Sequence, residues 1–408
     1  MKKPFIDYTK MLVTAVVEIT VMFVAVGCAL IGPQSGFFID HAGKIVFYNQ
    51  QVRRDSRFVD GFWCANSERE PKRTARFYNK SGQRVFKNDF DDARSFSNGL
   101  APVCRDGKWG FINTKGSLVI KPRYDEVLSF CSQRAPVRVK DRWGIVDERG
   151  KWVVEPIFEQ AAQFSEGLAA ICVDGKIGYI DRLGEVVVKP KFDEGGSFSE
   201  GLARVVVLDN DSLKARVQFV GKDGNVVLDL DSVLSNMGQT SSSLLYSGPQ
   251  RVLNCSYLFA DKNTWAPANP LDRYGPIRFS TARFSNGLIP FFVNKKWGYL
   301  NKNGKLVISA KFTRANEFFE GLALVSIGEM DVSEQFGFID DQGSFVIQPL
   351  YNVAKDFSDG LAKVSLGPTY RGWAFIDHSG KVVVKSHGQV GDFSMGLAPV
   401  QGPRALLF

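Results

Sequence analysis

The sequence predicts an all-β protein built from tandem repeats, and three observations support this. A motif of the form F-S-x-G-L-A recurs along most of the 408-residue chain. A turn in which Asp or Asn is followed three residues later by Gly recurs in phase with that motif. Glycine and phenylalanine are abundant, with 39 and 33 copies. A fixed period indicates a repeat architecture, and turn-forming glycines combined with aromatic residues favour short strands joined by tight turns.

The F-S-x-G-L-A motif sets the period. Its clearest copies begin at Phe96, Phe164, Phe198, Phe284, Phe357 and Phe393. A variant begins at Phe318, and degenerate copies of the motif begin at Phe58 and Phe130. Between Phe96 and Phe198 the step is 34 residues each time.

The Asp/Asn-x-x-Gly turn gives the number of units. It recurs at Asp40/Gly43, Asn79/Gly82, Asn113/Gly116, Asp147/Gly150, Asp181/Gly184, Asn301/Gly304, Asp340/Gly343 and Asp377/Gly380. The 120 residues between Asp181 and Asn301 divide into three steps of 40, with weak copies of the turn at Gly221/Gly224 and Asp261/Thr264. We therefore expect about ten units of 34–40 residues.

Residues 96–129 predict the structure of one unit as a small antiparallel meander. Its expected parts are a strand at Gly99–Cys104, a hairpin turn at Asp106-Gly107, a strand at Lys108–Ile112, a turn at Asn113–Gly116, a third strand from Ser117 to Ile120 closed by Pro122, and a short fourth strand from Tyr124. Asp-Gly is a typical two-residue hairpin, and proline cannot donate to a strand ladder. Such a meander buries too little apolar surface alone, so neighbouring units must stack.

The repeated phenylalanines and a tryptophan position are expected in the core between units. The Trp-Gly pair recurs as Trp109-Gly110, Trp143-Gly144 and Trp297-Gly298. Trp373 is followed by alanine, and Ile177 replaces the tryptophan before Gly178. A position that accepts isoleucine is expected to pack rather than to carry out chemistry. The glycine beside the tryptophan predicts a crowded contact with a neighbouring unit.

These segments resemble a known family. "GKWGFINTKGSLVIKPRYD", "DRWGIVDERGKWVVEPIFE" and "FSEGLA" are similar to the bacterial WG-repeat (KWG) family over about residues 36–408. The resemblance implies repeated β-meanders in bacterial proteins that are often exported or in the cell envelope, with a role in interactions. It implies no catalytic residues.

A curved, solenoid-like stack is the expected architecture, and one closed β-propeller or two propellers is the alternative. The chain enters the first unit in mid-repeat at Gly36 and leaves the last in mid-repeat after Val400, so the two half-units could pair and close a ring. Ten units exceed the usual four to eight blades, and 34 residues are few for a four-stranded blade. Residues 230–280 are degenerate and include a Ser-rich stretch expected to be an exposed loop.

Residues 1–33 predict an N-terminal hydrophobic helix that serves as a membrane anchor or signal segment. Lysines 2, 3 and 10 precede an apolar run over residues 11–31, which is long enough to span a bilayer. The lysine asymmetry places the repeat domain, residues 34–408, outside the cytoplasm of a bacterial cell envelope. Alternatively, Ala25-Val26-Gly27-Cys28 resembles a lipobox, which predicts lipidation at Cys28 or a secreted protein; a buried helix is a third interpretation.

The sequence contains no motif for catalysis, metal binding or a cofactor. HExxH, GxSxG and phosphate-loop patterns are absent, and two histidines, His41 and His378, fall inside the Asp-x-x-Gly turn. The formal charge of +8 is dispersed, so nucleic-acid binding is not expected. The cysteines form no pairing pattern and are expected as small apolar residues in strands. We therefore expect a non-catalytic, envelope-anchored scaffold that binds an unidentified protein, or alternatively a cell-wall or glycan binder that uses exposed aromatic side chains.

Overall fold

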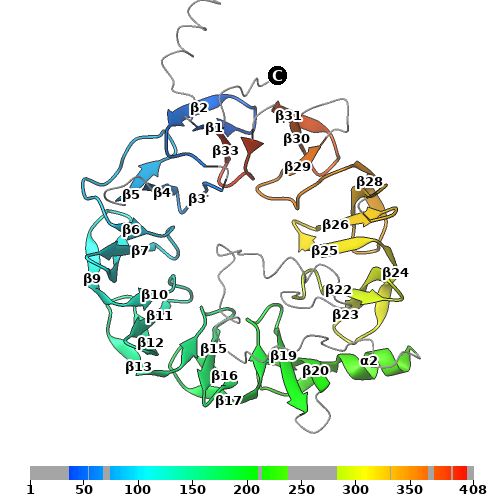
Figure 1. The fold of residues 1–408 in the computed structure, drawn as a ribbon, viewed down its shortest axis with the longest axis horizontal. Helices are drawn as coiled ribbons and strands as arrows, with labels where there is room; N and C mark the ends of the chain where they lie inside the picture. The colour runs from blue at the N-terminus through cyan, green and yellow to red at the C-terminus, as the bar shows by residue number, and fades with distance from the viewer. Residues whose placement is uncertain are drawn as a thin grey trace, which may run out of the picture.

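The chain folds into a closed ring of β-sheets. The computed structural model describes residues 36–53, 55–67, 74–209, 214–237, 283–330, 332–365, 372–386 and 389–401. Across these residues, nine antiparallel sheets follow one another around a central opening (Figure 1). The architecture is a nine-bladed β-propeller, so the closed alternative is confirmed, whereas the open solenoid-like stack and the pair of propellers are wrong.

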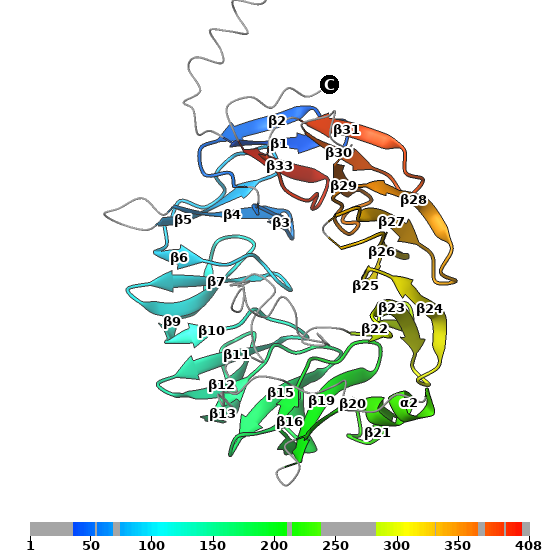
Figure 2. The ribbon, with the colours of Figure 1, turned by 45° about the vertical axis from the view of Figure 1, so that its right-hand side comes forward.

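Both ends of the described chain contribute to blade 1, which closes the ring. It contains β1 (Gly36–Asp40), β2 (Ile45–Asn49), β32 (Gln389–Val390) and β33 (Leu397–Gln401), in the order β2-β1-β33-β32. Strand β1 pairs with β33 in antiparallel register from Gly36 opposite Gln401 to Asp40 opposite Leu397. Figure 2 shows these first and last strands side by side. The pairing of the two half-units, which belonged to the closed alternative, is therefore what closes the ring.

The other eight blades follow in chain order. Blade 2 is β3 (Phe58–Val59), β4 (Phe62–Ser67) and β5 (Thr74–Asn79); blade 3 is β6 (Asp92–Ala93), β7 (Leu100–Arg105), β8 (Lys108–Asn113) and β9 (Leu118–Tyr124); blade 4 is β10 (Glu126–Val127), β11 (Arg134–Val139), β12 (Arg142–Asp147) and β13 (Trp152–Phe158). Blade 5 is β14 (Gln160–Ala161), β15 (Leu168–Val173), β16 (Lys176–Asp181) and β17 (Val186–Phe192); blade 6 is β18 (Glu194–Gly195), β19 (Leu202–Asp209), β20 (Lys214–Gly221) and β21 (Val226–Asp229). Blade 7 is β22 (Leu288–Val293), β23 (Lys296–Asn301) and β24 (Leu306–Phe312); blade 8 is β25 (Arg314–Phe319), β26 (Leu322–Ile327), β27 (Gln335–Ile339) and β28 (Phe345–Tyr351); blade 9 is β29 (Ala362–Ser365), β30 (Trp373–Ile376) and β31 (Val382–Ser386).

A very short inner strand lets 34 residues form a four-stranded blade. In blade 3, β6 has two residues, whereas β7, β8 and β9 have six or seven. The inner strand faces the central opening and the fourth strand lies on the outer rim (Figure 1). The argument that the unit is too short for a blade therefore failed, because the inner strand uses almost no sequence.

Successive loops of an antiparallel blade lie at opposite ends of its strands, which gives the ring two distinct faces. The loops of F-S-x-G and of Asp-x-x-Gly join the first strand to the second and the third to the fourth, so they share one face, which we call the turn face. The Asp106-Gly107 type of hairpin and the links between blades lie on the opposite face, which we call the hairpin face. In the turn at Asn113, the side-chain oxygen accepts from the amides of Lys115 and Ser117, both at 3.0 Å.

The outer strand continues past its proline, contrary to expectation. Strand β9 runs from Leu118 to Tyr124 and includes Pro122. Its register against β8 skips from Ile120 opposite Phe111 to Tyr124 opposite Trp109, so the proline lies in a bulge. Proline is tolerated there because an outer strand has one unpaired edge.

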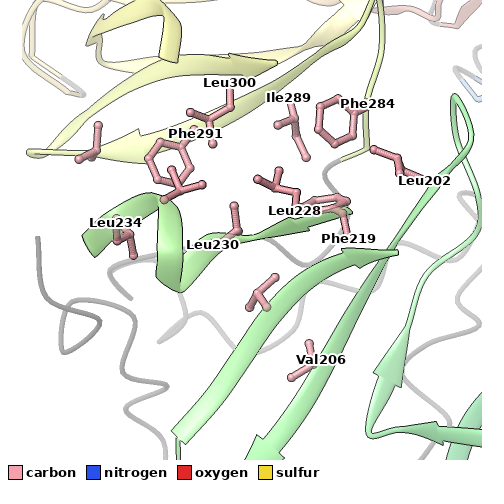
Figure 3. Packing of buried hydrophobic residues seen from close by; sticks show 13 residues of the cluster. Leu202, Val206, Phe219, Leu228, Leu230, Leu234, Phe284, Ile289, Phe291 and Leu300 are labelled. Atoms are coloured by element: carbon pink, nitrogen blue, oxygen red, sulfur yellow. The ribbon is translucent and has the colours of Figure 1, made fainter. Parts of the chain in front are cut away.

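Blades 6 and 7 are direct neighbours, so the expected tenth unit is not in the ring. A buried cluster joins Phe219 and Leu228 of blade 6 to Phe284 and Phe291 of blade 7, as Figure 3 shows. The helix α2 (Leu230–Asn236) follows β21 and adds Leu230, Val233 and Leu234 to the cluster. The weak turn at Gly221/Gly224 is formed, because the Gly224 amide donates to the Gly221 carbonyl at 2.9 Å. The weak copy at Asp261/Thr264 and the Ser-rich stretch lie outside the described residues.

Candidate functional site

The repeated phenylalanines lie between blades. All six predicted positions are at most 3% exposed, as are Phe58, Phe130 and Phe318. Each ring packs against the blade before it: Phe130 lies edge-on to Phe111 of blade 3, with 4.8 Å between ring centroids. The same contact joins Phe198 to Tyr179, Phe284 to Phe219, Phe318 to Tyr299, Phe357 to Phe338, Phe393 to Phe375, Phe58 to Phe38 and Phe96 to Phe77; Phe164 packs instead with Ile145 in the same kind of cluster.

The serine after each phenylalanine binds the next blade. The Ser97 hydroxyl donates to the carbonyl of Phe130 at 2.7 Å, and Ser165 donates to Phe198 in the same way at 2.7 Å. Corresponding bonds join Ser199 to Phe284, Ser285 to Phe318, Ser358 to Phe393 and Ser394 to Phe58. The last of these crosses the closure, and the bond from Ser199 bridges blades 6 and 7. The series breaks where cysteine, phenylalanine or valine replaces the serine, at Cys131, Phe319 and Val59.

An acidic residue in the same turn adds a second inter-blade contact on the turn face. The Glu200 carboxylate of blade 6 accepts from the Gly287 amide of blade 7 at 2.9 Å and pairs with Lys302 at 3.2 Å. Glu166 has the same two kinds of partner in blade 6, namely Gly201 and Lys222. The cation comes from the second position of the next blade's four-residue turn, after Asn301 in blade 7 and after Gly221 in blade 6.

Two of the histidines occupy that cation position. The Nε2 of His41 lies 3.3 Å from Asp359 of blade 9, and the Nε2 of His378 lies 3.3 Å from Glu320 of blade 8. The His378 ring also stacks on Phe357 at 4.2 Å between centroids. These side chains therefore contact the preceding blade. The sequence placed both histidines in a turn but gave no sign of this contact.

On the hairpin face, the lysine before the Trp-Gly position, which is Ile177-Gly178 in blade 5, joins neighbouring blades. The Lys108 Nζ of blade 3 lies 2.6 Å from Asp125 of blade 4, and the Lys176 Nζ lies 2.7 Å from Asp193 of blade 6. Asp125 also accepts from the Lys140 amide in its own blade's hairpin at 2.7 Å. The bond from Lys108, followed by that from the Lys140 amide, lowers the pKa of the Asp125 carboxyl below its ordinary value.

The glycine of Trp-Gly is required by the blade's own outer strand. A Cβ on Gly110 would lie 2.4 Å from the Ile120 carbonyl oxygen and 2.6 Å from the Pro122 nitrogen. Gly144 and Gly298 meet backbone atoms of the outer strands of their own blades, β13 and β24, in the same way. The crowding expected from a neighbouring unit is therefore real, but it arises within the blade at the proline bulge.

The tryptophans differ from one another in exposure. Trp143 is 8% exposed, whereas Trp109, Trp297 and Trp373 are half-buried. The guanidinium of Arg94 lies 4.6 Å above the Trp109 ring, and the Nζ of Lys363 lies 4.7 Å above the Trp373 ring. Trp297 contacts the ring of Phe292 at 5.3 Å.

A cavity of about 390 Å³ opens between blades 4 and 5. Its lining residues come from the inner strands, from β11 and β12, and from the hairpin between them: Glu126, Leu128, Arg138, Asp141, Trp143, Glu159, Gln160 and Ala161. Three carboxylates face one guanidinium there. Arg138 pairs with Glu126 at 3.0 Å.

Of the other two cavity carboxylates, Glu159 already pairs with Arg142 of blade 4, at 3.8 Å between its Oε1 and the arginine Nη1. Asp141 is exposed. Glu159 accepts from the Gly175 and Asp174 amides, both at 3.1 Å. The bond from Gly175 is the main cause that lowers the Glu159 pKa, which keeps this carboxylate charged.

The cysteines of the described chain form no disulfide with one another. Cys104 and Cys172 are buried in strands, and burial is the main cause that raises the pKa of the Cys104 thiol. In the described part of the chain, no group of three or more His, Cys, Asp or Glu residues could hold a metal ion. No helix among the described residues is both long and apolar enough to cross a bilayer. Residues 1–33, with the predicted segment 11–31 and Cys28, lie outside the described residues, as do Cys255 and His387.

The repeat geometry agrees with a match to a sequence family. Six segments match the family described as WG containing repeat, and they span residues 76–109, 109–143, 143–176, 177–210, 297–329 and 336–367. The chain is a WG-repeat protein. Its sequence matches no curated protein.

Several solved structures share only a distant likeness with this WG-repeat protein. KlHsv2 with loop 6CD replaced by a Gly-Ser linker is 11% identical, with 69% of this chain and 94% of that chain covered and a TM-score of 0.34. The biofilm matrix protein Bap1 of V. cholerae is 10% identical, with 91% and 88% covered and a TM-score of 0.27. TolB from Acinetobacter baumannii is 10% identical, with 85% and 80% covered and a TM-score of 0.27. The assignment of nine blades therefore rests on the strand pairing of the WG-repeat protein itself.

The sequence pattern did not lead us to predict the polar contacts between blades, although the residues that make them recur in the sequence. The serine after phenylalanine and the lysine before Trp-Gly recur in register, as does an acidic residue after the aromatic residue that ends the outer strand. Repeated apolar residues predict a core, but a repeated polar residue does not reveal whether its partner lies in the same unit or the next.

Proposed function

We propose that this WG-repeat protein is a non-catalytic scaffold that binds a protein partner. A closed propeller of repeats is an architecture that offers binding surfaces, and it presents two broad faces around a ring. The observation that carries the proposal is the use of the repeated polar residues. Ser97, Glu200 and Lys108 represent three repeated positions, and each bonds to the next blade.

The division between repeated and variable positions supports binding rather than catalysis. The repeated positions hold the ring together, so recognition falls to side chains that differ from blade to blade, such as those around the cavity between blades 4 and 5. A rigid ring that presents variable side chains suits a partner with an extended surface. It needs no shared reactive group.

We prefer a protein partner to a glycan because two of the four tryptophan rings are covered by cations and none of the four is fully exposed. A sugar stacks on an open aromatic face, but Arg94 covers Trp109 and Lys363 covers Trp373. Trp143 is largely buried and Trp297 is half-buried against Phe292. These four side chains do not form an exposed row.

The experiment for the scaffold proposal is capture of partners by the full chain. Photo-crosslinking groups at exposed positions of the hairpin face, for example Asp141, and of the turn face, for example Arg182, should each report neighbours in an extract of the source cells. We expect one face to yield a reproducible protein partner in competition with unlabelled protein. Failure of both faces to yield a competable protein, with retention on purified peptidoglycan, would favour the glycan alternative.

We also propose that residues 11–31 anchor the protein in a bacterial envelope membrane, with the ring outside the cytoplasm. This proposal is supported by the apolar length of that segment and by the lysines before it. Fractionation of the full chain and of a chain that lacks residues 1–33 tests the anchor, since equal solubility of the two would refute it. Labelled palmitate that is lost in Cys28→Ala would instead support lipidation at Cys28.

A further inference from the structure

Two blade interfaces contain an internal cation at the same place. In the interface of blades 3 and 4, the Arg94 guanidinium lies over Trp109 and donates to the carbonyl of Val127 on the next inner strand. In the interface of blades 9 and 1, Lys363 lies over Trp373 and its Nζ donates to the carbonyl of Val390 at 2.8 Å. Val127 and Val390 hold the same position, the second residue of a two-residue inner strand.

The two cations come from two strands that pair with each other within a blade. Arg94 follows the inner strand β6 of blade 3, whereas Lys363 lies in β29 of blade 9, which corresponds to the second strand of blade 3. The amide of Arg94 donates to the Pro102 carbonyl, and the amide of Lys355 donates to the Lys363 carbonyl. The two blades therefore place Arg94 and Lys363 at neighbouring positions across the first and second strands. Either position can supply a positive charge to the tryptophan and to the carbonyl of the next blade.

The interface of blades 4 and 5 has the tryptophan without the cation. The residue that corresponds to Arg94 is Leu128, and the one that corresponds to Lys363 is Pro136, since the Leu128 amide donates to the Pro136 carbonyl. Among the described residues, no lysine or arginine is placed over the Trp143 ring. Ala161 holds the position of Val127 and Val390, as the second residue of β14.

The cavity of about 390 Å³ lies at this interface. It is lined by Leu128, Trp143 and Ala161, which are the counterparts of the cation, the ring and the carbonyl in the filled interfaces. Three carboxylates line it, and two of them are ion-paired, Glu126 with Arg138 at 3.0 Å and Glu159 with Arg142 at 3.8 Å, so three negative charges stand against two guanidinium groups. The local charge is therefore negative, although the whole chain carries +8. A positively charged group over an indole ring is attracted by the ring's negative face, more strongly where water is excluded.

We propose that this cavity binds a lysine or arginine side chain of a protein partner. The cationic group would lie over Trp143 and donate to the Ala161 carbonyl, as Arg94 and Lys363 do within the chain, with Asp141 and Glu159 at its rim. The proposal rests on the scaffold function and names the chemical class of the partner's contact. It assigns recognition to the hairpin face.

The test measures binding of short peptides to the full chain by ligand-observed NMR titration. The probes are acetyl-Gly-Arg-Gly-amide, its lysine counterpart and its citrulline counterpart, which keeps the shape of arginine without its charge. Agmatine tests whether a free guanidinium suffices without a peptide. We expect the arginine and lysine peptides to bind, and the citrulline peptide to bind at least about tenfold more weakly, because charge over an indole ring is the main attraction.

Two arginine variants separate the cavity from general electrostatics. Leu128→Arg recreates the Arg94 arrangement inside the cavity, so we expect at least about tenfold weaker peptide binding with an unchanged or higher unfolding midpoint. Gly196→Arg is the matched control, because Gly196 holds the corresponding position in blade 6 and a Cβ there has only ordinary contact with the Arg204 carbonyl, at 3.6 Å. It adds the same charge at another interface and should leave binding unchanged.

Three results would overturn the proposal: equal binding of the arginine and citrulline peptides, full binding by Leu128→Arg, or no binding of either cationic peptide by the folded full chain. Agmatine binding with no peptide binding would show a small-molecule site and would also overturn it. If crosslinking captures a protein partner equally with the full chain and with Leu128→Arg, the scaffold proposal stands and the cavity proposal fails.

Discussion

Substitution of Gly110 by alanine tests the structural role of the Trp-Gly pair. The new methyl group would lie 2.4 Å from the Ile120 oxygen, 2.6 Å from the Pro122 nitrogen and 2.8 Å from the Lys121 carbonyl carbon, all of them backbone atoms of β9. Such distances require the outer strand to move away from β8, because a peptide backbone cannot rotate aside as a side chain can. Overpacking of this kind costs about 2–3 kcal/mol.

Hydrogen exchange measures this cost where it arises. If β9 amides exchange by local opening, a loss of about 2–3 kcal/mol raises their exchange rates by about 30-fold to 160-fold. The matched control is Gly107→Ala, which has open space around the new methyl and a φ of +72°. Gly107→Ala should destabilise the protein only because alanine disfavours a left-handed backbone, by about 1–2 kcal/mol. The faster exchange should then be seen in the β7–β8 hairpin rather than in β9.

The outcome that refutes the steric argument is equally specific. If Gly110→Ala leaves β9 exchange unchanged, or perturbs it no more than Gly107→Ala does, the outer strand can accommodate a side chain. The glycine would then be retained for another reason. Selective acceleration of β9, with unchanged exchange in blade 6, would support the close approach described above.

Three further predictions concern the contacts between blades and the packing of the strands. Ser394→Ala should lower the free energy of unfolding in urea by about 2 kcal/mol, because the Ser394 hydroxyl accepts from the Phe58 amide at 2.8 Å and donates to the Phe58 carbonyl at 3.2 Å. Ser165→Ala loses one donated bond and should lower it by about 1 kcal/mol, and equal losses would contradict a special role at the closure. The carboxyl pKa values of Asp125 and Glu159 are lower in the folded chain than the unfolded value of about 4, so both groups stabilise the fold above that pH. This stability is lost as the pH falls through the lower folded pKa values. The urea concentration at the unfolding midpoint should therefore decrease below about pH 4, and it should decrease less steeply in Asp125→Asn. Burial and the raised pKa of the Cys104 thiol should protect it from iodoacetamide at pH 8 until the protein unfolds, whereas the half-buried Cys131 should react sooner. Peptide mass spectrometry measures the labelling of each cysteine. Rapid labelling of Cys104 in the folded protein would contradict its packing in β7.

The repeat pattern predicted the local structure of the blades because that structure depends on residues close in sequence. Asp106-Gly107 forms the expected hairpin, and Asn113 with Gly116 forms the expected turn. Pro122 misled the prediction, since proline ends most strands but is tolerated in a bulge of an outer strand. Its effect depends on whether a further strand pairs beyond it, which the repeat alone does not state.

The candidate site was less predictable than the blades. The Leu128 position is apolar in the sequence and gives no sign of a binding cavity. It becomes informative only when the fold shows that Leu128 lines a cavity together with Trp143 and holds the position from which Arg94 covers Trp109 in another interface. Comparison between blades requires the cross-strand register, which comes from the structure.

The sequence by itself determined the β-meander unit, its turns, its buried phenylalanines and its family, since each follows from spacing within about 34 residues. Only the tertiary structure decided that the units form one ring of nine. A stack and a ring use the same contacts between neighbours and differ in the small angle between successive blades, which no single repeat encodes. That angle brings β1 beside β33 and places Ser199 against Phe284, so the ring closes while the expected tenth unit is left out of it.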